Sequence, residues 1–251
     1  MYDLPKLDLK RTQQKIEEFI GNYDRVVLGV SGGLDSACVA TLSVNALGKD
    51  NVKGILMPDG DHDMKDAFDV VKKLDIEYNV KPIGPVLNGY AEMLGMENED
   101  RVALANIKAR TRMTTLYYHA NKEKRIVAGT GDRSEILVGY FTKYGDGGVD
   151  ILPIGNLYKT QVRNLSREIG VPEKIIQKPS SPDLWKGQTA EGELGMSYEE
   201  LDKILYNLVD RDLKIGEVDY DRNKVEYVKG LIDKNAHKCA MPPVAEVAYY
   251  E

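Results

Sequence analysis

Short segments with strand-like composition alternate with amphipathic segments along the chain. Strands are predicted at residues 25–30, 51–57, 77–82, 125–129 and 151–154, and helices at residues 1–22, 37–47, 67–74, 99–121, 198–209 and 221–236. The continuous apolar run at 25–30 is typical of a strand buried on both faces of a parallel sheet. The alternation predicts an α/β fold: a doubly wound, Rossmann-like five-stranded parallel sheet with helices on both faces.

Composition and charge agree with this fold and limit the classes of partner that the protein can bind. The 251 residues are 42% hydrophobic and 29% charged, which suits one domain spanning residues 1–251. A net charge of −6 argues against broad nucleic-acid binding, because affinity for a phosphate backbone needs a basic surface. Without a signal peptide or a long apolar run, we expect a cytoplasmic protein with no membrane partner.

The two cysteines do not suggest disulfide or zinc chemistry. Cys38 and Cys239 are far apart and lack C-x-x-C spacing. Cys38 also falls inside the predicted helix 37–47, so we expect it to pack in the core.

A serine-glycine turn joins the first apolar strand to the helix after it. The turn reads Ser31-Gly32-Gly33-Leu34-Asp35-Ser36. Glycines let the backbone approach an oxyanion, and the N–H groups of the helix N-terminus favour negative charge, so the turn predicts a phosphate site. The Walker pattern is absent, and an acid, Asp35, occupies the anion site, which implies a bridging Mg²⁺. The alternative is a glycine-rich turn in which Asp35 is an ordinary first-turn acid.

A second loop, Thr130-Gly131-Asp132-Arg133-Ser134-Glu135, follows the strand predicted at 125–129. If that strand lies beside the first one across the topological switch, Glu135 faces Asp35 and the two acids can share one Mg²⁺. The alternative makes Asp132 an N-cap and Glu135 its capping-box partner three residues later.

Three further features suggest contacts with a polar ligand. Lys159 begins a helix, where the dipole disfavours a cation unless an anion compensates it. In the glycine-rich stretch 139–150, Lys143, Asp146 and Asp150 alternate with aromatic residues, which suits a polar ligand with rings, although such a stretch is more often an exposed loop. Arg110 shares a helix face with Asn106 and Met113, while Arg112 points elsewhere; the arginines could hold a second phosphate or carboxylate, or lie at the surface.

The segment 178–189 is too rich in Pro, Ser and Gly for a helix or strand, and we interpret it as a mobile lid.

Several motifs in one order resemble the ammonia-dependent NAD⁺ synthetases of the ATP-pyrophosphatase superfamily. Besides the S-G-G-x-D-S loop, the resemblance includes Asn106-Ile107-Lys108-Ala109-Arg110-Thr111-Arg112-Met113, the stretch 139–148, Leu184-Trp185-Lys186-Gly187-Gln188-Thr189, Glu193-Leu194-Gly195 and His237-Lys238. It runs from residue 28 to residue 243. The resemblance implies that ATP adenylates deamido-NAD⁺ with release of pyrophosphate, and that ammonia then displaces AMP.

The resemblance also implies roles for individual residues. ATP would be held by Gly29, Val30, Ser31, Gly32, Gly33, Leu34, Asp35 and Ser36, with contacts from Thr130, Lys159 and Ser181. The Mg²⁺ acids would be Asp35 and Glu135, and deamido-NAD⁺ would be positioned by Arg110, Lys143, Asp150, His237 and Lys238. Asp146 resembles the family acid near the ammonia, so Asp35, Asp146 and Lys159 would act in the chemistry. The family usually carries Asn where Asp132 stands.

The resemblance implies a homodimer, and the absence of room for a fused glutaminase predicts that free ammonia suffices.

Two alternative functions use the same loop. One is another ATP-pyrophosphatase ligase, such as a tRNA-modifying or nucleotide-amidating enzyme, against which the acidic charge and the lack of paired cysteines count. The other is a nucleotide sensor without catalysis, which the presence of Asp35, Glu135 and Lys159 weakens.

Overall fold

The computed structural model describes residues 1–60, 63–96, 101–182, 184–185 and 187–247. Its centre is a parallel sheet of four strands in the order β3-β2-β1-β4. The strands are β1 (Val26–Gly29), β2 (Val52–Leu56), β3 (Glu77–Val80) and β4 (Ile126–Val127). The strand β1 pairs with β2 on one side, and its Val26 lies beside Ile126 of β4 on the other. The order therefore reverses at β1, which is the predicted topological switch.

The prediction of five strands was wrong. Residues 151–154 pair with the sheet only through an isolated parallel bridge between Ala128 and Ile151. Pro153 has no backbone N–H to donate, so a ladder cannot continue through it.

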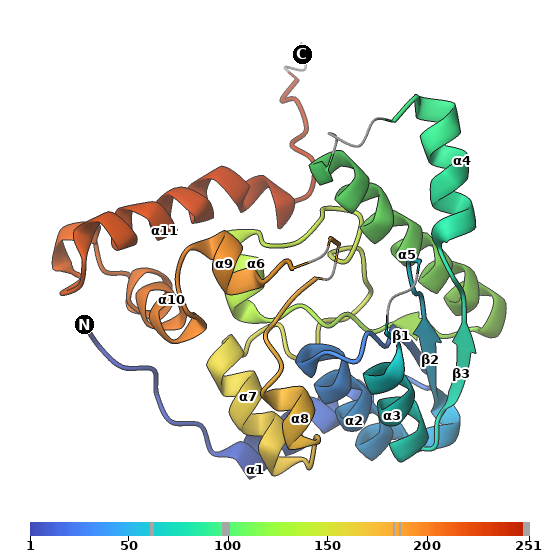
Figure 1. Ribbon diagram of the computed structural model, residues 1–251. Coiled ribbons are helices and arrows are strands. Elements are labelled where there is room, and N and C mark those ends of the chain that lie inside the picture. The colour runs from blue at the N-terminus through green and yellow to red at the C-terminus, as the bar shows by residue number, and fades with distance from the viewer. Residues whose placement is uncertain (61–62, 97–100, 183, 186, 248–251) are drawn as a thin grey trace, which may run out of the picture.

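Helices cover both faces of the sheet, as Figure 1 shows. One face packs against α1 (Leu9–Ile20), α2 (Leu34–Leu47), α3 (Lys65–Lys73), α7 (Lys159–Glu168) and α8 (Glu173–Ile176). The other face packs against α4 (Gly84–Leu94) and α5 (Arg101–Glu123). Alternate residues of β1 point to opposite faces, so Val26 and Leu28 join the first core and Val27 joins the second.

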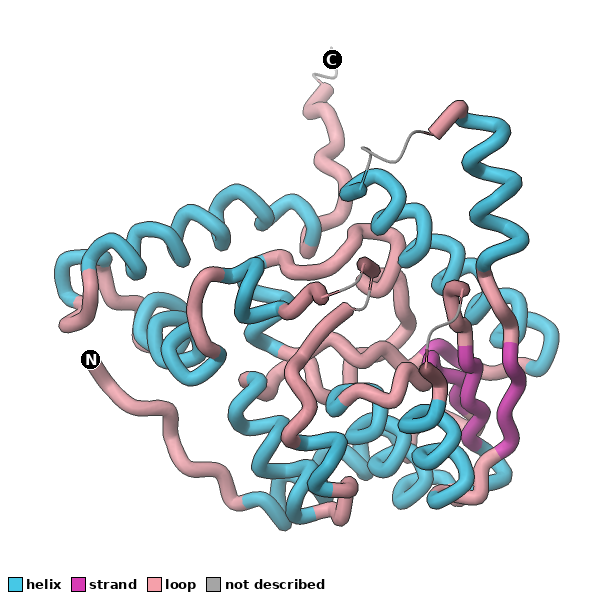
Figure 2. The backbone as a smooth tube through the Cα atoms, viewed as in Figure 1, coloured by secondary structure: helices cyan, strands magenta, loops and turns pink. Residues whose placement is uncertain are grey.

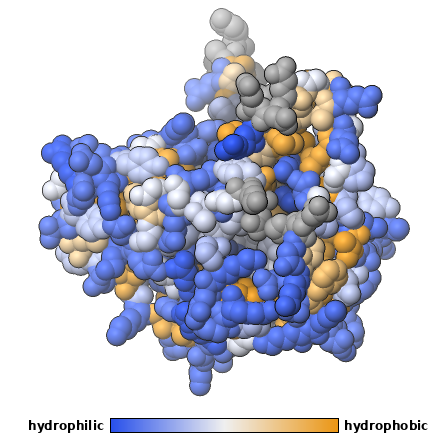
Figure 3. Space-filling view, viewed as in Figure 1, coloured by the Kyte–Doolittle hydropathy of each residue, from blue (hydrophilic) through white to orange (hydrophobic). Residues whose placement is uncertain are grey.

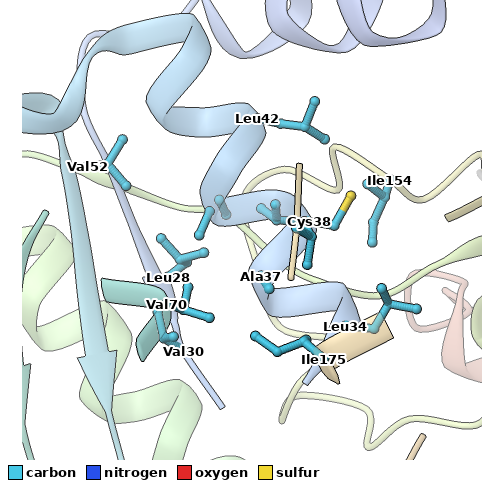
Figure 4. Close-up of a cluster of buried hydrophobic side chains, with 14 of the residues drawn as sticks. Leu28, Val30, Leu34, Ala37, Cys38, Leu42, Val52, Val70, Ile154 and Ile175 are labelled. Atoms are coloured by element: carbon cyan, nitrogen blue, oxygen red, sulfur yellow. The ribbon is translucent and has the colours of Figure 1, made fainter. Parts of the chain in front are cut away.

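Cys38 lies in the first core, as the sequence predicted. Its side chain is fully buried and, in Figure 4, points from α2 toward Ile154. Burial raises the pKa of its thiol to about 12, so the thiol stays protonated and inert at neutral pH.

A separate apolar core joins the remaining helices beside the sheet. These are α6 (Arg133–Val138), α9 (Ala190–Leu194), α10 (Tyr198–Leu205) and α11 (Arg222–Asn235). A π-helical turn (Tyr206–Asp210) extends α10, and short 3₁₀ turns lie at Lys49–Asn51, Ile215–Glu217 and Ala236–Lys238. Among the described helices, none combines the length and apolar character needed to cross a membrane.

The loops that follow the strands meet between these groups of helices, in the middle of the view in Figure 2. Right-handed crossovers bring the carboxyl ends of parallel strands to one edge, and this edge holds a large cavity.

Candidate active site

A cavity of about 1210 Å³ opens at the carboxyl edge of the sheet. The loops after β1, β2 and β4 form its floor, and α5, residues 139–148 and the described part of residues 178–188 contribute walls. Its size exceeds that of a typical pocket for a small ligand, so it can accommodate more than one nucleotide-sized group.

The first loop is shaped by hydrogen bonds among its own residues. Ser31 Oγ lies 3.1 Å from Ser36 Oγ and accepts a bond from Gly33 N at 3.2 Å. Ser36 Oγ also donates to Gly33 O at 3.1 Å. Gly33 is the N-cap of α2 and supplies no side-chain cap, and the first turn of α2 lies at the cavity, which Gly33, Leu34, Asp35 and Ser36 line.

Gly32 is required by the packing of this loop. Its φ is +80°, and a Cβ at this position would lie 2.6 Å from the backbone nitrogen of Ala67 in α3. Only glycine fits, because both the left-handed backbone and the contact with α3 exclude a side chain.

Lys159 lies at the centre of the charged residues on the cavity floor. It is the first residue of α7, its side chain is fully buried, and Nζ lies 2.7 Å from Asp35 Oδ2 and 2.9 Å from Glu135 Oε1. Asp132 Oδ2 is also 2.9 Å from Nζ. The predicted facing of Asp35 and Glu135 is thus confirmed, and the anion that the lysine needed is supplied by three carboxylates of the chain.

The electrostatics of this cluster keep the lysine charged. Burial alone lowers the pKa of Lys159, but the three carboxylates outweigh burial and hold it well above the ordinary value. Burial raises the pKa of Asp132 to about 6, and burial together with the charge of Asp132 raises the pKa of Glu135 well above its usual range. The single ammonium of Lys159 therefore offsets only part of the cost of burying the charged forms of these acids.

The capping-box interpretation of the second loop is confirmed, and Glu135 also lines the cavity. Asp132 caps α6, accepting a hydrogen bond from Glu135 N at 2.9 Å, and Glu135 Oε2 accepts from Asp132 N at 3.3 Å. The other oxygen of Glu135 accepts from Lys159 Nζ. Asp132 is fully buried, whereas the side chains of Asp35 and Glu135 are 21% and 20% exposed at the cavity wall.

Asp35 and Glu135 fit the predicted Mg²⁺. Asp35 Oδ1 is buried and makes no hydrogen bond, so it is available as a ligand. Mg²⁺ prefers oxygen ligands and usually takes one or two carboxylates together with substrate phosphates. Within the described ranges, no cluster of three or more His, Cys, Asp or Glu side chains is arranged to hold a metal by itself.

Asp146 lies in the opposite wall, in the loop after α6. Burial raises its pKa, and only part of this rise is offset by hydrogen bonds from backbone N–H groups and by the charges of Lys238 and Arg112. Thr142 N donates to Asp146 Oδ1 at 2.9 Å, while Thr142 Oγ1 donates to Asn106 Oδ1 at 2.7 Å. The loop 142–146 is thereby fixed against α5.

The structure brings together most of the predicted ATP residues. Of the predicted site residues, those that line the cavity are Gly29, Val30, Ser31, Gly33, Leu34, Asp35, Ser36, Thr130, Ser181, Glu135, Asp146 and Lys238, whereas Gly32 is not part of the lining. Lys159 lies beneath the floor and reaches it through its carboxylate partners.

The remaining predicted substrate residues lie outside the cavity lining. Lys143 Nζ donates to His237 O at 2.5 Å, and Arg110 donates to Lys143 O at 3.3 Å, so these three residues meet on the outer side of the 139–148 loop. Asp150 accepts from Val127 N at 2.7 Å and from Tyr117 Oη at 2.9 Å, so it secures the end of the sheet.

The predicted orientation of the arginines was wrong. Arg112 lines the cavity and donates to Met57 O at 3.3 Å, whereas Arg110 does not line it. Ala105 and Ala109, four positions apart and buried, mark the inner face of α5, and this spacing was the signal that could have placed Arg112.

The segment 178–189 contains neither helix nor strand in its described part, as predicted; Asp183 and Lys186 lie outside the described residues. Lys108 of α5 donates to Leu184 O at 2.9 Å, and Gln188 Nε2 donates to Glu193 Oε2 at 2.7 Å. Sequence reasoning missed these anchoring roles, because single polar residues in a helix carry no pattern that names a distant partner.

The fold and the cavity together define an α/β protein with a large cavity at the carboxyl edge of a parallel sheet, lined by the glycine turn after the first strand and by the carboxylates Asp35 and Glu135. Residues 9–242 match the sequence profile of the family described as NAD synthase, so the chain belongs to the NAD synthase family.

Known proteins resemble the chain over almost its whole length. It is 47% identical to the NH(3)-dependent NAD(+) synthetase of Hyperthermus butylicus, with 98% of this chain and 94% of the relative covered. Two solved structures align with 96% of this chain, and the alignment covers 100% of each of those chains. The NMN synthetase from Francisella tularensis has a TM-score of 0.85 and 31% sequence identity. The NH3-dependent NAD synthetase from Campylobacter jejuni, in complex with the nitrate ion, has a TM-score of 0.82 and 32% sequence identity. These matches support the NAD synthetase interpretation and not the tRNA-modifying alternative.

Proposed function

We propose that the chain is an ATP-dependent ligase that converts deamido-NAD⁺ to NAD⁺ with free ammonia, releasing AMP and pyrophosphate. The observation that carries this proposal is the junction of Asp35, Glu135 and Lys159 under a cavity large enough for a nucleotide and an acceptor, in a chain of the NAD synthase family. No side chain is needed as a nucleophile, because both substrates bring their reactive groups.

In the first step, a carboxylate oxygen of the pyridine ring attacks the α-phosphorus of ATP, and the bond from that phosphorus to the bridging oxygen of pyrophosphate breaks. The loop 31–36 and the N–H groups that begin α2 bind the phosphates. Asp35 and Glu135 would hold Mg²⁺, which supplies positive charge to the leaving pyrophosphate when bound. Lys159 fixes the two carboxylates in place through its hydrogen bonds to both.

In the second step, ammonia attacks the acyl carbon, the bond to the AMP oxygen breaks, and one proton leaves the nitrogen. Asp146 is the base we assign to that proton. Its burial raises its pKa, so its carboxylate takes up a proton more readily than an exposed one does.

The test is to incubate the purified protein with ATP, Mg²⁺, ammonium and deamido-NAD⁺ and to measure NAD⁺ and AMP. Equal amounts of both products are expected, and glutamine in place of ammonium should give none. ATP binding without turnover would instead favour the sensor, and AMP formation only with an RNA substrate would favour the RNA-modifying ligase.

A second acceptor is favoured by one comparison. Because the NMN synthetase from Francisella tularensis superposes with a TM-score of 0.85, nicotinic acid mononucleotide belongs in the same assay. We expect the dinucleotide to have the higher kcat/KM, since the nearer sequence relative is described as an NAD(+) synthetase.

The homodimer also remains part of this proposal. Large apolar side chains stay exposed on α4 and at the start of α5, namely Val86, Tyr90, Met93, Leu94 and Val102. Figure 3 shows apolar surface gathered on this side of the molecule. Such a patch is typical of an interface, and light scattering that gives twice the monomer mass would support the dimer. A cytoplasmic location stays a prediction.

A further inference from the structure

Asp202 of α10 is a buried carboxylate that no step above uses. Its side chain is fully buried, and it accepts hydrogen bonds from Ser134 Oγ at 2.5 Å, Thr160 N at 2.9 Å and Thr160 Oγ1 at 2.7 Å. Burying an acid is costly unless several donors compensate it, and here three donors do.

The donors lie directly beside the charged residues of the cavity floor. Ser134 precedes Glu135 at the start of α6, and Thr160 follows Lys159 at the start of α7. Lys159 N also donates to Ser134 Oγ at 2.9 Å. The first two N–H groups of α7 are therefore bound by side chains of α6 and α10, since Tyr158 at the N-cap is not a residue type that caps helices.

The same helix also contacts the far end of Lys159. Tyr198, one turn before Asp202 in α10, is fully buried, and its ring centre lies 5.2 Å from Lys159 Nζ. A charged ammonium over an aromatic ring is attractive. The helix α10 thus holds the backbone next to Lys159 through the bond from Thr160 N to Asp202, and it contacts the ammonium of Lys159 through Tyr198.

We propose that Asp202 is a positioning residue for adenylation, which fixes the starts of α6 and α7 against each other and so sets the place of Lys159 relative to Glu135. The inference rests on the proposed function. Rates of group transfer depend steeply on geometry, and a displacement of about 1 Å can cost about 100-fold. A carboxylate bound by three donors on two helices cannot move without losing hydrogen bonds to both.

The experiment compares Asp202→Asn with Glu199→Gln. Glu199 also joins α10 to α7, through Arg163 at 2.6 Å, but it is 61% exposed and does not touch the start of α7. Exchange of labelled pyrophosphate into ATP, measured with deamido-NAD⁺ and without ammonia, reports adenylation alone. We expect Asp202→Asn to slow this exchange about 10- to 100-fold with the KM for deamido-NAD⁺ unchanged, and Glu199→Gln to leave it unchanged.

All rates are measured well below the melting temperature of each variant, where a loss of stability alone does not alter the rate. Thr160→Val removes one hydroxyl donor with little change of shape, and Thr160→Ser keeps that donor. Exchange should fall in Thr160→Val and recover in Thr160→Ser. This pair decides the question if Asp202→Asn fails to fold.

Two results would overturn the inference alone: an active wild type with undiminished exchange in folded Asp202→Asn, or equal exchange in Thr160→Val and Thr160→Ser. A wild type that shows no exchange would overturn the proposed function, and the positioning role with it.

Discussion

Lys159 Nζ lies 2.7 Å from Asp35 Oδ2, although 124 positions separate the two residues. The contact ties the start of α7 to the start of α2, two helices that pack on the same face of the sheet. The loop after β1 is therefore held both by its own serines and by a buried cation from the second half of the chain.

Asp35→Asn should leave the fold intact and reduce NAD⁺ formation roughly 100-fold, because the site loses a charged ligand for the cation that faces the pyrophosphate. Steady-state assays with circular dichroism check both parts. Asp75→Asn is the matched control, since Asp75 forms a surface ion pair with Lys49 away from the cavity. Unchanged turnover in Asp35→Asn would show that the first loop is only a turn.

Asp132→Asn should be tolerated. Asparagine caps helices as well as aspartate does, and the change removes one of three carboxylates that share a single ammonium. We expect the free energy of unfolding at neutral pH to stay within about 1 kcal/mol of wild type, with NAD⁺ formation retained. Asp132→Ala, which also removes the cap, should cost about 1 kcal/mol more in denaturant unfolding. Equal losses in both variants would mean that the charge of Asp132 is required.

Gly32→Ala and Gly48→Ala separate backbone strain from steric conflict. Both glycines have φ near +80°, but a Cβ at Gly48 meets nothing within 4 Å, while at Gly32 it meets the backbone of α3. Gly48→Ala should cost about 1–3 kcal/mol of unfolding free energy and keep ATP binding. Gly32→Ala should cost more and abolish ATP binding in calorimetry. Retention of ATP affinity by Gly32→Ala would contradict the assigned loop.

Glu123 should contribute to stability in a pH-dependent way. Burial raises its pKa, but hydrogen bonds from Lys53, His119 and Arg125 outweigh burial and lower the pKa from 4.5 to about 2. A lowered pKa in the folded state gives stability above the unfolded pKa near 4.5, which is lost as the pH falls toward 2.

Glu123→Gln should therefore lose up to about 3 kcal/mol of unfolding free energy at pH 7, and the difference from wild type should shrink below pH 4.5. Denaturant titrations at pH 7 and pH 3 measure it. Glu226→Gln is the control, because its ion pair with Arg222 is largely exposed. A difference that is the same at both pH values would refute the linkage.

The sequence predicted well wherever local chemistry decides the structure. The strand, glycine turn and helix around residues 25–47 form as expected, because an apolar run, a turn and a helix start are all local signals. The helix α4 was missed, although Pro85 stands in its first turn, where proline favours a helix start. That residues 1–251 fold as one domain stays a prediction.

The partners of buried charges were harder to predict. Lys159 was expected to meet an anion, but periodicity does not say which distant acids reach it, and the structure surrounds it with Asp35, Asp132 and Glu135. Likewise, the resemblance assigned Lys143 and His237 to substrate binding. Their hydrogen bond to each other depends on how the C-terminal segment packs against the 139–148 loop, which no local pattern encodes.

Two lysines cross between the 139–143 loop and the chain near residue 240. Lys143 donates to the carbonyls of His237 and Ala240, and Lys238 donates to the carbonyls of Gly139 and Phe141. Every amino acid offers a backbone carbonyl, so this junction places little demand on the identity of the accepting residues. Evolution can therefore alter the side chains at His237, Ala240 and Phe141 without loss of these bonds, and with them the surface that they present. Gly139 is fixed instead by its own backbone, because its φ is +66° and an added Cβ would lie 2.2 Å from Asn235 Cβ.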